Sequence, residues 1–306
     1  MFENLFAKHG VSLERLKTFL EVAQAGSIVE AAHGDLTRQS QYSRQIKELE
    51  EFFGMPLADR RGKFLQITPV GRKLANIIAQ SFSGLSDLKN ECAEMRYNFS
   101  IGGMDSVLEW IVCPLISEAT AKNSKWTFSV ERHRNIYSYN KLINMELDLA
   151  VVTKDTISSD IISYKNLGEL SYSVYAHKKI LSKLPKKAAK DAKFLLENLP
   201  VAFLIDEYTF TKVLKNQCDA YSIKPNIVLK VHTFQYLLKL IKTSNFIGIL
   251  PDVAKPEIPN ELVKIPAPFL KAMKQNIVLA WNKRNAIIRP ELKNVATYLL
   301  KNSQSF

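Results

Sequence analysis

The sequence predicts a multidomain protein with an all-α N-terminal domain, one long helix, and a C-terminal α/β region of two lobes. Three observations support this prediction. Apolar residues recur at helical spacing between Leu13 and Phe53, with helix-capping residues between the segments. No proline follows Pro69 before Pro114, so one helix can extend to about Met95. From Phe99 onward, short apolar runs alternate with helical segments.

Length and composition agree with this division. The 306 residues exceed one ordinary domain of ~100 to 200 residues, and 46% hydrophobic with 24% charged residues is typical of globular proteins. The chain lacks the uncharged apolar run of about 18 residues that a bilayer span needs, and residues 1–11 do not resemble a secretory signal. We therefore expect a cytoplasmic protein without a membrane partner.

The cysteines and histidines predict no metal site and no cofactor. Three cysteines are an odd number without a CxxC pair, so we expect buried thiols rather than a disulfide framework or a zinc site. The five histidines have no metal-like spacing; they are His9, His33, His133, His177 and His232.

The net charge of +12 suggests an anionic partner, but most of it lies outside the N-terminal part. Residues 1–97 contain 13 Lys and Arg against 12 Asp and Glu, a net charge of +1, so +11 falls in residues 98–306. The informative stretch is 38–73, where eight basic residues outnumber four acidic ones.

The N-terminal domain is predicted to contain three helices. Ser12 can cap the first, which ends at Gly26, and Ser27 with Glu30 forms a capping box for a short second helix. Gly34 and Asp35 break the second helix, and Thr37 can cap a third that extends from about Arg38 to Phe52.

The third helix has two different faces. An apolar face belongs to the core and consists of Tyr42, Ile46, Leu49 and Phe53. With Arg38 at the helix start, the polar side carries Gln39, Ser40, Ser43, Arg44 and Lys47. Such side chains can reach base edges and phosphates in a DNA major groove, although an ordinary solvated face remains an alternative. A helix placed after a short helix and a tight turn favours the DNA interpretation.

Two short strands around a basic turn are predicted after the third helix. The turn carries Arg60, Arg61 and Lys63, and Phe64 to Ile67 forms the second strand. Cations at this position can lie along the DNA backbone and add affinity more than sequence choice, while a solvent-exposed hairpin tip is the alternative. The arrangement is a winged helix-turn-helix.

A gapless pattern between Leu16 and Gly71 resembles the N-terminal domain of LysR-type transcriptional regulators. The matching residues are Phe19, Ser27, Ala31-Ala32, Gln39, Ser43-Arg44-Gln45-Ile46, Leu49-Glu50, Gly54, Pro56-Leu57, Arg60 and Thr68-Pro-Val-Gly71. The resemblance implies that Gln39, Ser43 and Arg44 face the groove and that Arg60 lies at the wing. Asp35, Arg38 and Ala58 depart from the family's usual residues.

The long helix is predicted to start at Pro69, with Thr68 as its N-cap. An apolar stripe along it consists of Leu74, Ile78, Leu85, Leu88, Cys92 and Met95. Such a stripe is compatible with ordinary core packing or with helix pairing. The resemblance implies an antiparallel homodimer at this linker helix, with assembly into a homotetramer, and two half-sites on the DNA.

The remaining residues predict two parallel-sheet lobes with a cleft between them. Strand-like runs are Phe99–Gly102, Trp126–Val130, Leu149–Val152, Tyr172–Tyr175, Val201–Ile205, Ile227–Val231, Phe246–Leu250 and Ile277–Trp281. The pattern resembles the family's periplasmic-binding-protein-like effector domain. We expect domains at 1–67, 68–97 and 98–306, with lobe one at about 98–171 and 271–306 and lobe two at about 172–270.

Candidate effector-binding residues follow the predicted strands, where ligands of α/β sheets bind. By analogy with the resembling effector domain, they are Asp105, Ser106, Thr153, Tyr208, Thr209, Thr233 and Phe234. A Ser or Thr at such a position is also an ordinary helix N-cap. A carboxylate at Asp105 repels an anionic ligand unless a Lys or Arg pairs with it, so the sequence favours a neutral effector or one with an amine or hydroxyl.

The sequence therefore predicts a DNA-binding transcriptional regulator controlled by a small-molecule effector, with double-stranded DNA and, as a further candidate, RNA polymerase as partners. We predict no enzyme, because P-loop, GxGxxG, GxSxG and HExxH motifs are absent from the sequence. One alternative is a C-terminal domain that mediates protein-protein interaction without a ligand. A solute-binding protein is another, and it requires a signal peptide.

Overall fold

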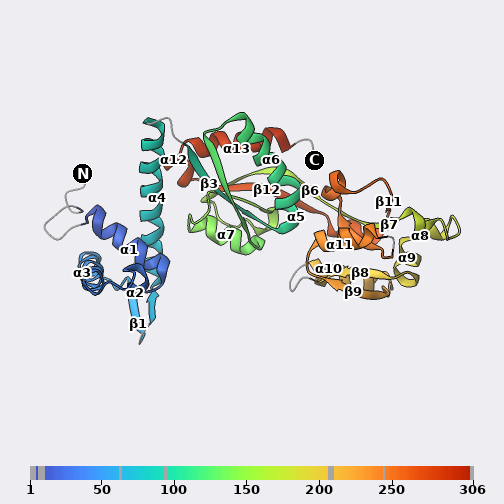
Figure 1. Cartoon of the computed structure of the whole chain (residues 1–306), viewed down its shortest axis with the longest axis horizontal. Coiled ribbons are helices and arrows are strands. Elements are labelled where there is room, and N and C mark those ends of the chain that lie inside the picture. The colour runs from blue at the N-terminus through green and yellow to red at the C-terminus, as the bar shows by residue number, and fades with distance from the viewer. Residues whose placement is uncertain are drawn as a thin grey trace.

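The computed structural model describes residue 5 and residues 11–61, 64–92, 96–205, 210–243 and 245–303; the side chains of Arg60, Arg61, Phe64 and Glu91 are not described. Figure 1 shows an elongated molecule with the N-terminal helices at one end, α4 (Pro69–Cys92) beside them, and the α/β region beyond. Within the described residues, no helix is both long enough and apolar enough to cross a membrane.

The three predicted N-terminal helices are present as α1 (Leu13–Ala25), α2 (Ile28–Ala31) and α3 (Leu36–Phe53). The Ser12 hydroxyl accepts a hydrogen bond from the Arg15 amide, and Gly26 ends α1 in a left-handed conformation. Ser27 caps α2 in the same way, through the Glu30 amide. Phe19, Leu49 and Ile78 are fully buried or nearly so at the centre of the domain, where α1, α3 and α4 meet.

The predicted wing is an antiparallel pair of strands, β1 (Ala58–Arg61) and β2 (Phe64–Ile67). The linker helix α4 follows directly, and the Thr68 hydroxyl caps it by accepting from the Gly71 amide at 3.0 Å. The apolar stripe of α4 divides into two parts. Leu74 and Ile78 pack in the N-terminal core, whereas Leu85 and Leu88 are 56% and 57% exposed.

Lobe one is built on a five-stranded sheet with the order β4-β3-β5-β12-β6. Its strands are β3 (Tyr97–Gly103), β4 (Trp126–Arg132), β5 (Leu149–Thr153), β6 (Ile162–Leu170) and β12 (Gln275–Asn282). The helical segments of this lobe are α5 (Asp105–Val107), the π-helical turn η2 (Leu108–Val112), α6 (Cys113–Lys122), α7 (Asn135–Ile143), η3 (Lys154–Thr156), α12 (Asn285–Ile288) and α13 (Glu291–Asn302). Apolar side chains of β3 and β5 pack under α6 and α13.

Lobe two contains a three-stranded sheet with the order β10-β7-β11 and a parallel pair, β8-β9, which a bridge between Val201 and Ile247 connects to it. The strands are β7 (Tyr172–His177), β8 (Val201–Leu204), β9 (Ile227–Val231), β10 (Gly248–Pro251) and β11 (Leu262–Ile265). The helical segments are α8 (Lys178–Leu181), η4 (Ala188–Lys190), α9 (Ala192–Asn198), α10 (Phe210–Ala220), α11 (Phe234–Lys242), η5 (Asp252–Glu257) and η6 (Pro268–Met273).

The prediction of two parallel sheets was correct for β3 with β4 and β5 and for β8 with β9, but wrong for the other pairs. β12 pairs antiparallel with both β5 and β6, and β7 pairs antiparallel with β10 and β11. The sequence analysis also missed β6 and β11. In β6 only Ile162, Leu167 and Leu170 are buried, because it is an edge strand, so it lacks the continuous apolar run of a central strand.

The chain passes between the lobes at two places. Ser171 separates β6 of lobe one from β7 of lobe two. On the return, η6 still packs in the core of lobe two, and β12 begins at Gln275. We therefore propose that the domains lie as predicted, except that the chain returns from lobe two to lobe one at Lys274 rather than at about residue 271.

Two smaller predictions were also wrong. Cys92 and Cys113 are exposed, and only Cys218 is the expected buried thiol. Phe53 is exposed rather than part of the core, because it lies at the last residue of α3.

Candidate functional sites

The start of α3 differs from the prediction, because Asp35 and not Thr37 is its N-cap. The Asp35 carboxylate accepts hydrogen bonds from the amides of Thr37 at 2.8 Å and Arg38 at 3.1 Å. A carboxylate at this position satisfies two free amides and complements the helix dipole. The helix therefore begins at Leu36, two residues earlier than expected, and this apolar side chain is 78% exposed.

Polar contacts fix one side of α3 to α1. The Tyr42 hydroxyl donates to Glu21 at 2.8 Å, and the Gln41 amide donates to Glu14 at 3.2 Å. Further along the helix, Glu48 forms an ion pair with Arg15 of α1 at 2.8 Å. These contacts, with Ile46 and Leu49 in the core, set the rotation of α3 about its own axis.

The other side of α3 is open to solvent. We call it the α3 face and define it by Leu36, Gln39, Ser40, Ser43, Arg44 and Lys47. Ser40 is exposed, and Gln39 and Ser43 are half-buried. The side chains of Arg44 and Lys47 are 81% and 76% exposed, and each pairs with a glutamate one turn later, at 2.9 and 3.8 Å. Such surface pairs contribute little stability, so phosphates or bases can replace them at small cost.

Arg38 does not join this face. It lies near Asp35, with 3.9 Å between Nε and the carboxylate, and lines a hollow between α1, α2 and α3 together with Glu21 and Tyr42. At 100° per residue Arg38 is also about half a turn away from Ser40 and Lys47. It is therefore the one predicted α3 residue that the structure separates from the others.

The Glu50 side chain holds the start of the wing to the end of α3. Its carboxylate accepts from the amides of Leu57 at 2.8 Å and Ala58 at 3.1 Å, where β1 begins. The strand register places Arg60 opposite Leu65 and Arg61 opposite Phe64. The predicted wing residue Lys63 and the side chains of Arg60 and Arg61 lie outside the described residues.

In lobe one, Asp105 forms an ion pair with Arg132 at 2.7 Å. The two residues follow β3 and end β4, so the ends of neighbouring parallel strands bring them together. Because the Arg132 guanidinium neutralises the Asp105 carboxylate, this carboxylate no longer repels an anionic ligand. The inference that Asp105 disfavours an anionic effector is therefore withdrawn.

Ser106 and Thr153 are buried. The Thr153 hydroxyl accepts from the Asn135 amide at 3.0 Å and lies 2.9 Å from the Thr156 hydroxyl, so its hydrogen bonds stabilise the end of β5 and the start of α7. In lobe two, Thr233 is the N-cap of α11 through the Tyr236 amide, as the alternative interpretation expected. Tyr208 and Thr209 lie outside the described residues.

Phe234 belongs to a cluster of aromatic rings where the lobes meet. Trp110 of lobe one is only 2% exposed and packs against Phe234, with ring centroids 6.4 Å apart. Phe210 and Tyr172 complete the cluster, at 5.3 and 6.2 Å from Phe234. The sequence analysis missed Trp110, because it lies inside a helical segment and not at the end of a strand.

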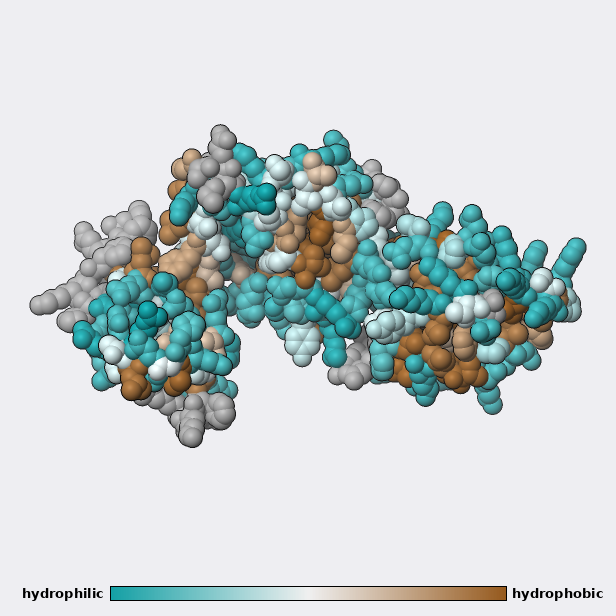
Figure 2. Space-filling model, in the orientation of Figure 1, coloured by the Kyte–Doolittle hydropathy of each residue, from teal (hydrophilic) through white to brown (hydrophobic). Residues whose placement is uncertain are grey.

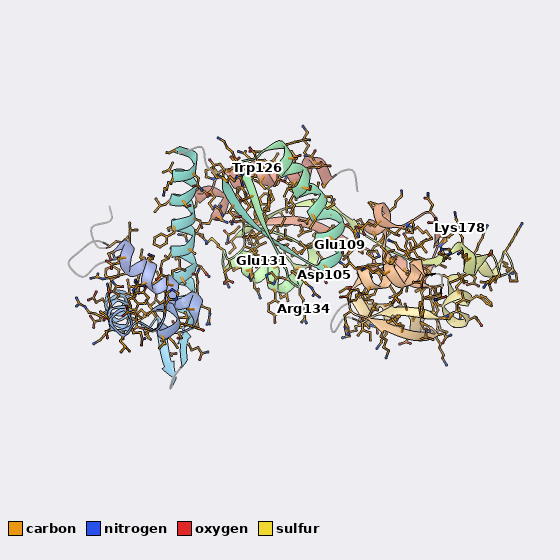
Figure 3. All side chains as sticks on the ribbon, in the orientation of Figure 1. Asp105, Glu109, Trp126, Glu131, Arg134 and Lys178 are labelled. Carbon is orange, nitrogen blue, oxygen red and sulfur yellow. The ribbon has the colours of Figure 1, made fainter. Side chains whose placement is uncertain are left out.

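Glu109 was also missed. Figure 3 shows Asp105 and Glu109 on the side of lobe one that faces lobe two. Burial raises the pKa of Glu109, and the charges of Glu257 and Asp105 raise it further. Glu109 lies four residues, about one helical turn, after Asp105, and this spacing is the signal that could have identified it.

The family models match nearly the whole described chain. The model for the LysR substrate binding domain matches residues 93–303, and the model for the bacterial regulatory helix-turn-helix protein, lysR family, matches residues 13–72. The chain belongs to the LysR family. It is a LysR-type DNA-binding transcriptional regulator with an effector-binding domain.

Several curated LysR-type regulators are similar to this one. MetR of Haemophilus influenzae is 31% identical over 87 residues, a match that covers 28% of each chain. CysB of the same organism is 20% identical over 270 residues, covering 85% of this chain and 81% of CysB. GltC of Bacillus subtilis is 23% identical over 265 residues, covering 85% and 87%.

Solved structures of full-length LysR-type regulators share the fold. ArgP from Mycobacterium tuberculosis superposes with a TM-score of 0.68 at 17% identity, covering 94% of this chain and 97% of ArgP. LysG from Corynebacterium glutamicum, solved with the effector Arg bound, gives 0.65 at 15% identity, covering 95% and 98%. Full-length CbnR in complex with its target DNA gives 0.59 at 17% identity, covering 96% and 100%.

Proposed function

We propose that this LysR-type regulator recognises a specific operator duplex by inserting the α3 face into the major groove. The observation that carries the proposal is that α3 has one side packed in the domain and another side open to solvent. Tyr42 and Glu48 contact α1, and Ile46 and Leu49 are buried in the core. Gln39, Ser40, Arg44 and Lys47 lie together on another side of the helix. The major groove of B-DNA is wide enough to admit an α-helix.

Each side chain of the α3 face suits a particular contact. Glutamine bonds adenine, and arginine bonds guanine or phosphate. Leu36, at the first turn of the helix, adds an apolar group that can contact a thymine methyl. The wing cations Arg60, Arg61 and Lys63 would neutralise backbone phosphates and so contribute affinity and salt dependence. We propose that Arg38, which lies on another side of α3, takes no part in base recognition.

We infer that the operator has two half-sites, because two copies of the chain would pair through α4. Leu85 and Leu88 lie on the solvent side of the helix and form an apolar patch that the single chain leaves uncovered. A homodimer through this patch, or a homotetramer built from two dimers, presents two recognition helices to a roughly palindromic sequence. Contact with RNA polymerase stays a prediction.

Competition gel shifts with the duplex upstream of the regulator's own gene test the DNA proposal. Arg44→Ala and Gln39→Ala should each lose ~1 to 3 kcal/mol of specific binding if the side chain makes a bidentate base contact. Arg38→Ala is the matched control, since it removes an arginine from the same helix on another side. Equal losses in Arg38→Ala and Arg44→Ala, or complexes that excess nonspecific DNA removes, would overturn the assignment.

We further propose that a small-molecule effector binds between the lobes, next to the Asp105–Arg132 pair. The side chain of Arg132 is largely exposed, so its guanidinium can exchange Asp105 for a ligand group. Native mass spectrometry, after incubation with the fraction of a cell extract below ~1 kDa, measures a retained small molecule. Arg132→Gln should reduce the fraction of protein that carries the added mass. Lys125→Gln, an exposed position at the other end of β4, should leave that fraction unchanged.

The aromatic contact between the lobes favours one alternative. Trp110 of lobe one packs inside the core of lobe two, so apolar side chains connect the two lobes directly. If no added mass is found and Trp110→Ala changes regulation of a reporter gene but not operator affinity, then the C-terminal domain acts through protein-protein interaction instead.

A further inference from the structure

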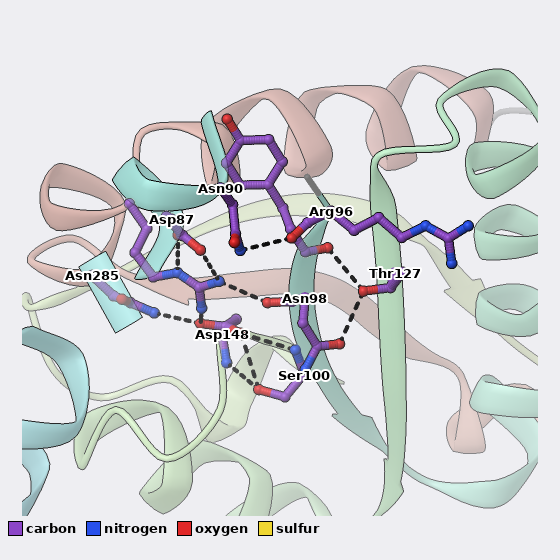
Figure 4. A network of polar contacts seen from close by, with 10 residues as sticks. Asp87, Asn90, Arg96, Asn98, Ser100, Thr127, Asp148 and Asn285 are labelled. Carbon is purple, nitrogen blue, oxygen red and sulfur yellow. Dashed lines mark hydrogen bonds and ion pairs between the residues drawn. The ribbon is translucent and has the colours of Figure 1, made fainter. Parts of the chain in front are cut away.

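A buried arginine connects the linker helix to lobe one. Arg289 follows α12 and is almost completely buried. Its guanidinium bonds both oxygens of Asp87 on α4, at 2.5 Å from Nε and 3.2 Å from Nη2. Figure 4 labels Asp87 and draws its bonds as dashed lines. Two parallel bonds of this kind fix the angle between the two side chains.

The same guanidinium also bonds lobe one. Nη1 donates to the Asp148 carboxylate at 2.5 Å, and Nη2 donates to the Asn98 carbonyl of β3 at 2.7 Å. Asp148 itself accepts from the Ser100 amide at 2.9 Å and from the Asn285 amide group at 2.9 Å. One side chain therefore bonds α4, β3 and the segment that precedes β5.

The Arg289 guanidinium lies between two carboxylates, those of Asp87 and Asp148. Burial alone would lower the pKa of Arg289, but the hydrogen bonds and charges of Asp87 and Asp148 outweigh burial and raise it. The guanidinium thus stays charged, and so do the bonds that depend on it. A lysine could not replace it, because an ammonium lacks the planar set of five donors that reaches three partners.

A second, apolar contact holds α4 to the same part of lobe one. Gly84 of α4 faces Ile288 at the end of α12, and a Cβ added at Gly84 would stand 2.7 Å from the Ile288 Cγ2. That distance is shorter than van der Waals contact, so the close approach of α4 and α12 requires a glycine. The two contacts lie about one helical turn apart on α4.

The N-terminal domain, in contrast, stands across a hollow from lobe one. This hollow of about 730 Å³ is lined by Leu20 and Gln24 of α1 on one side and by Met145 and Glu146 of lobe one on the other. The helix α4 lines it too, through Ala79 and Ser83. The orientation of the N-terminal domain relative to lobe one therefore depends on how α4 is held.

We propose that Arg289 is a positioning residue for operator recognition: with Asp87, Asp148 and the Gly84–Ile288 contact, it fixes α4 and lobe one as one rigid unit. We call these four contributions the Arg289 joint. The joint sets the orientation of α4, and of the N-terminal domain with its recognition helix α3, relative to lobe one. This orientation determines the spacing of half-sites that an oligomer accepts. The joint also transmits to α4 any rotation of lobe one. The effect of the joint on operator binding rests on the proposed DNA function, whereas the rigid attachment of α4 to lobe one does not.

The first test measures the joint without DNA. Spin labels at Lys73→Cys on α4 and Lys293→Cys on α13, in a chain whose native cysteines are replaced and which is diluted with unlabelled chain, report the distance between the two elements. Both positions are exposed. We expect one narrow distance distribution, and a broad one in Asp87→Asn, which leaves the Arg289–Asp148 pair of lobe one in place. The exposed carboxylate control Glu118→Gln should keep the narrow distribution.

A compensating pair of substitutions shows whether packing at the joint matters. Gly84→Ala should broaden the distribution, and Gly84→Ala with Ile288→Ala should restore it, because the second change removes the Cγ2 that the new Cβ meets. A variant that merely failed to fold would not be rescued in this way.

The second test measures operator binding. Asp87→Asn should bind a single half-site within about twofold of the parent, but should bind the full operator about tenfold more weakly, because a loose joint lowers the effective concentration of the second recognition helix. Narrow distance distributions in both Asp87→Asn and Gly84→Ala, or equal losses on half-site and full operator, would overturn the proposal. If the parent bound no DNA while Asp87→Asn still broadened the distances, the proposed function would fail and the joint would stand.

Discussion

Gly71, in the first turn of α4, lies directly against the backbone carbonyl of Leu57, the residue before the wing. A Cβ at Gly71 would overlap the Leu57 oxygen and would also stand 2.9 Å from the Ile67 Cγ2. The Thr68 hydroxyl donates to the carbonyl of Pro56 at 2.9 Å in the same place. The glycine thus permits the wing, the end of α3 and the linker helix to meet at one point.

Gly71→Ala should therefore destabilise the N-terminal domain. Backbone atoms cannot yield as a flexible side chain can, so we expect a loss of about 1 to 3 kcal/mol, measured by urea unfolding. Gly168→Ala is the matched control, because a Cβ at Gly168 meets no atom within 4 Å. A stability change of the same size in both variants would contradict this explanation.

Much of the N-terminal domain could be predicted because its signals are local. Ser12, Gly26 and Ser27 mark helix ends within a few residues of the groups they bond. The same rule failed at Asp35, where an aspartate next to Gly34 was interpreted as a helix breaker. Either Asp35 or Thr37 can cap a helix, and only the structure shows that the Asp35 carboxylate reaches two amides.

The C-terminal region was harder to predict because its pairings are not local. The direction of β12 depends on where the chain returns from lobe two, which its own apolar residues do not encode. Likewise, Arg289 and Asp87 are about two hundred positions apart, and no spacing rule connects them. Of the candidate effector residues, Asp105 pairs with Arg132, which no spacing rule singles out, and Thr233 caps α11, as its residue type allows.

Self-association should depend on the exposed leucines of α4. Burying a leucine contributes about 1.5 to 3 kcal/mol, so Leu85→Glu should raise the dimer dissociation constant by at least about tenfold in analytical ultracentrifugation. Val228→Glu replaces an apolar residue of lobe two with similar exposure and should leave the constant unchanged. An unaltered sedimentation profile for Leu85→Glu would exclude this patch as the dimer contact.

Acid should weaken lobe two through Asp252. Its carboxylate accepts from Ser171 at 2.7 Å and Tyr175 at 3.0 Å and pairs with Lys264 at 2.9 Å. Burial alone would raise the pKa of Asp252, but the bonds from Ser171 and Lys264 outweigh burial and lower it.

The sign of the pH dependence follows from that lowered pKa. The stabilisation is complete above the pKa of an unfolded aspartate, about 3.9, and is lost as the pH falls through the lower pKa of the folded protein. Asp252→Asn should cost about 2 kcal/mol at pH 7, and thermal unfolding should show this difference shrinking as the pH falls below about 4. A difference that stays constant with pH would show that the Asp252 charge is not involved.

The thiols should differ sharply in reactivity. Burial raises the pKa of Cys218 to about 11, with a further contribution from Asp219. In a Cys92→Ser background at pH 8, a disulfide reagent should modify Cys113 in the native protein and Cys218 only after denaturant is added, because the thiolate is the reactive form. Rapid modification of both thiols without denaturant would contradict the buried position of Cys218.

The central claim is that the α3 face selects the operator sequence. The most direct measurement is the ratio of dissociation constants for the operator and for a base-shuffled duplex of equal length, at one salt concentration, for the parent and for Gln39→Ala/Arg44→Ala. We predict that the ratio falls by about 10- to 10⁴-fold in the double variant while shuffled-duplex binding changes much less. An unchanged ratio in the double variant would contradict recognition by α3.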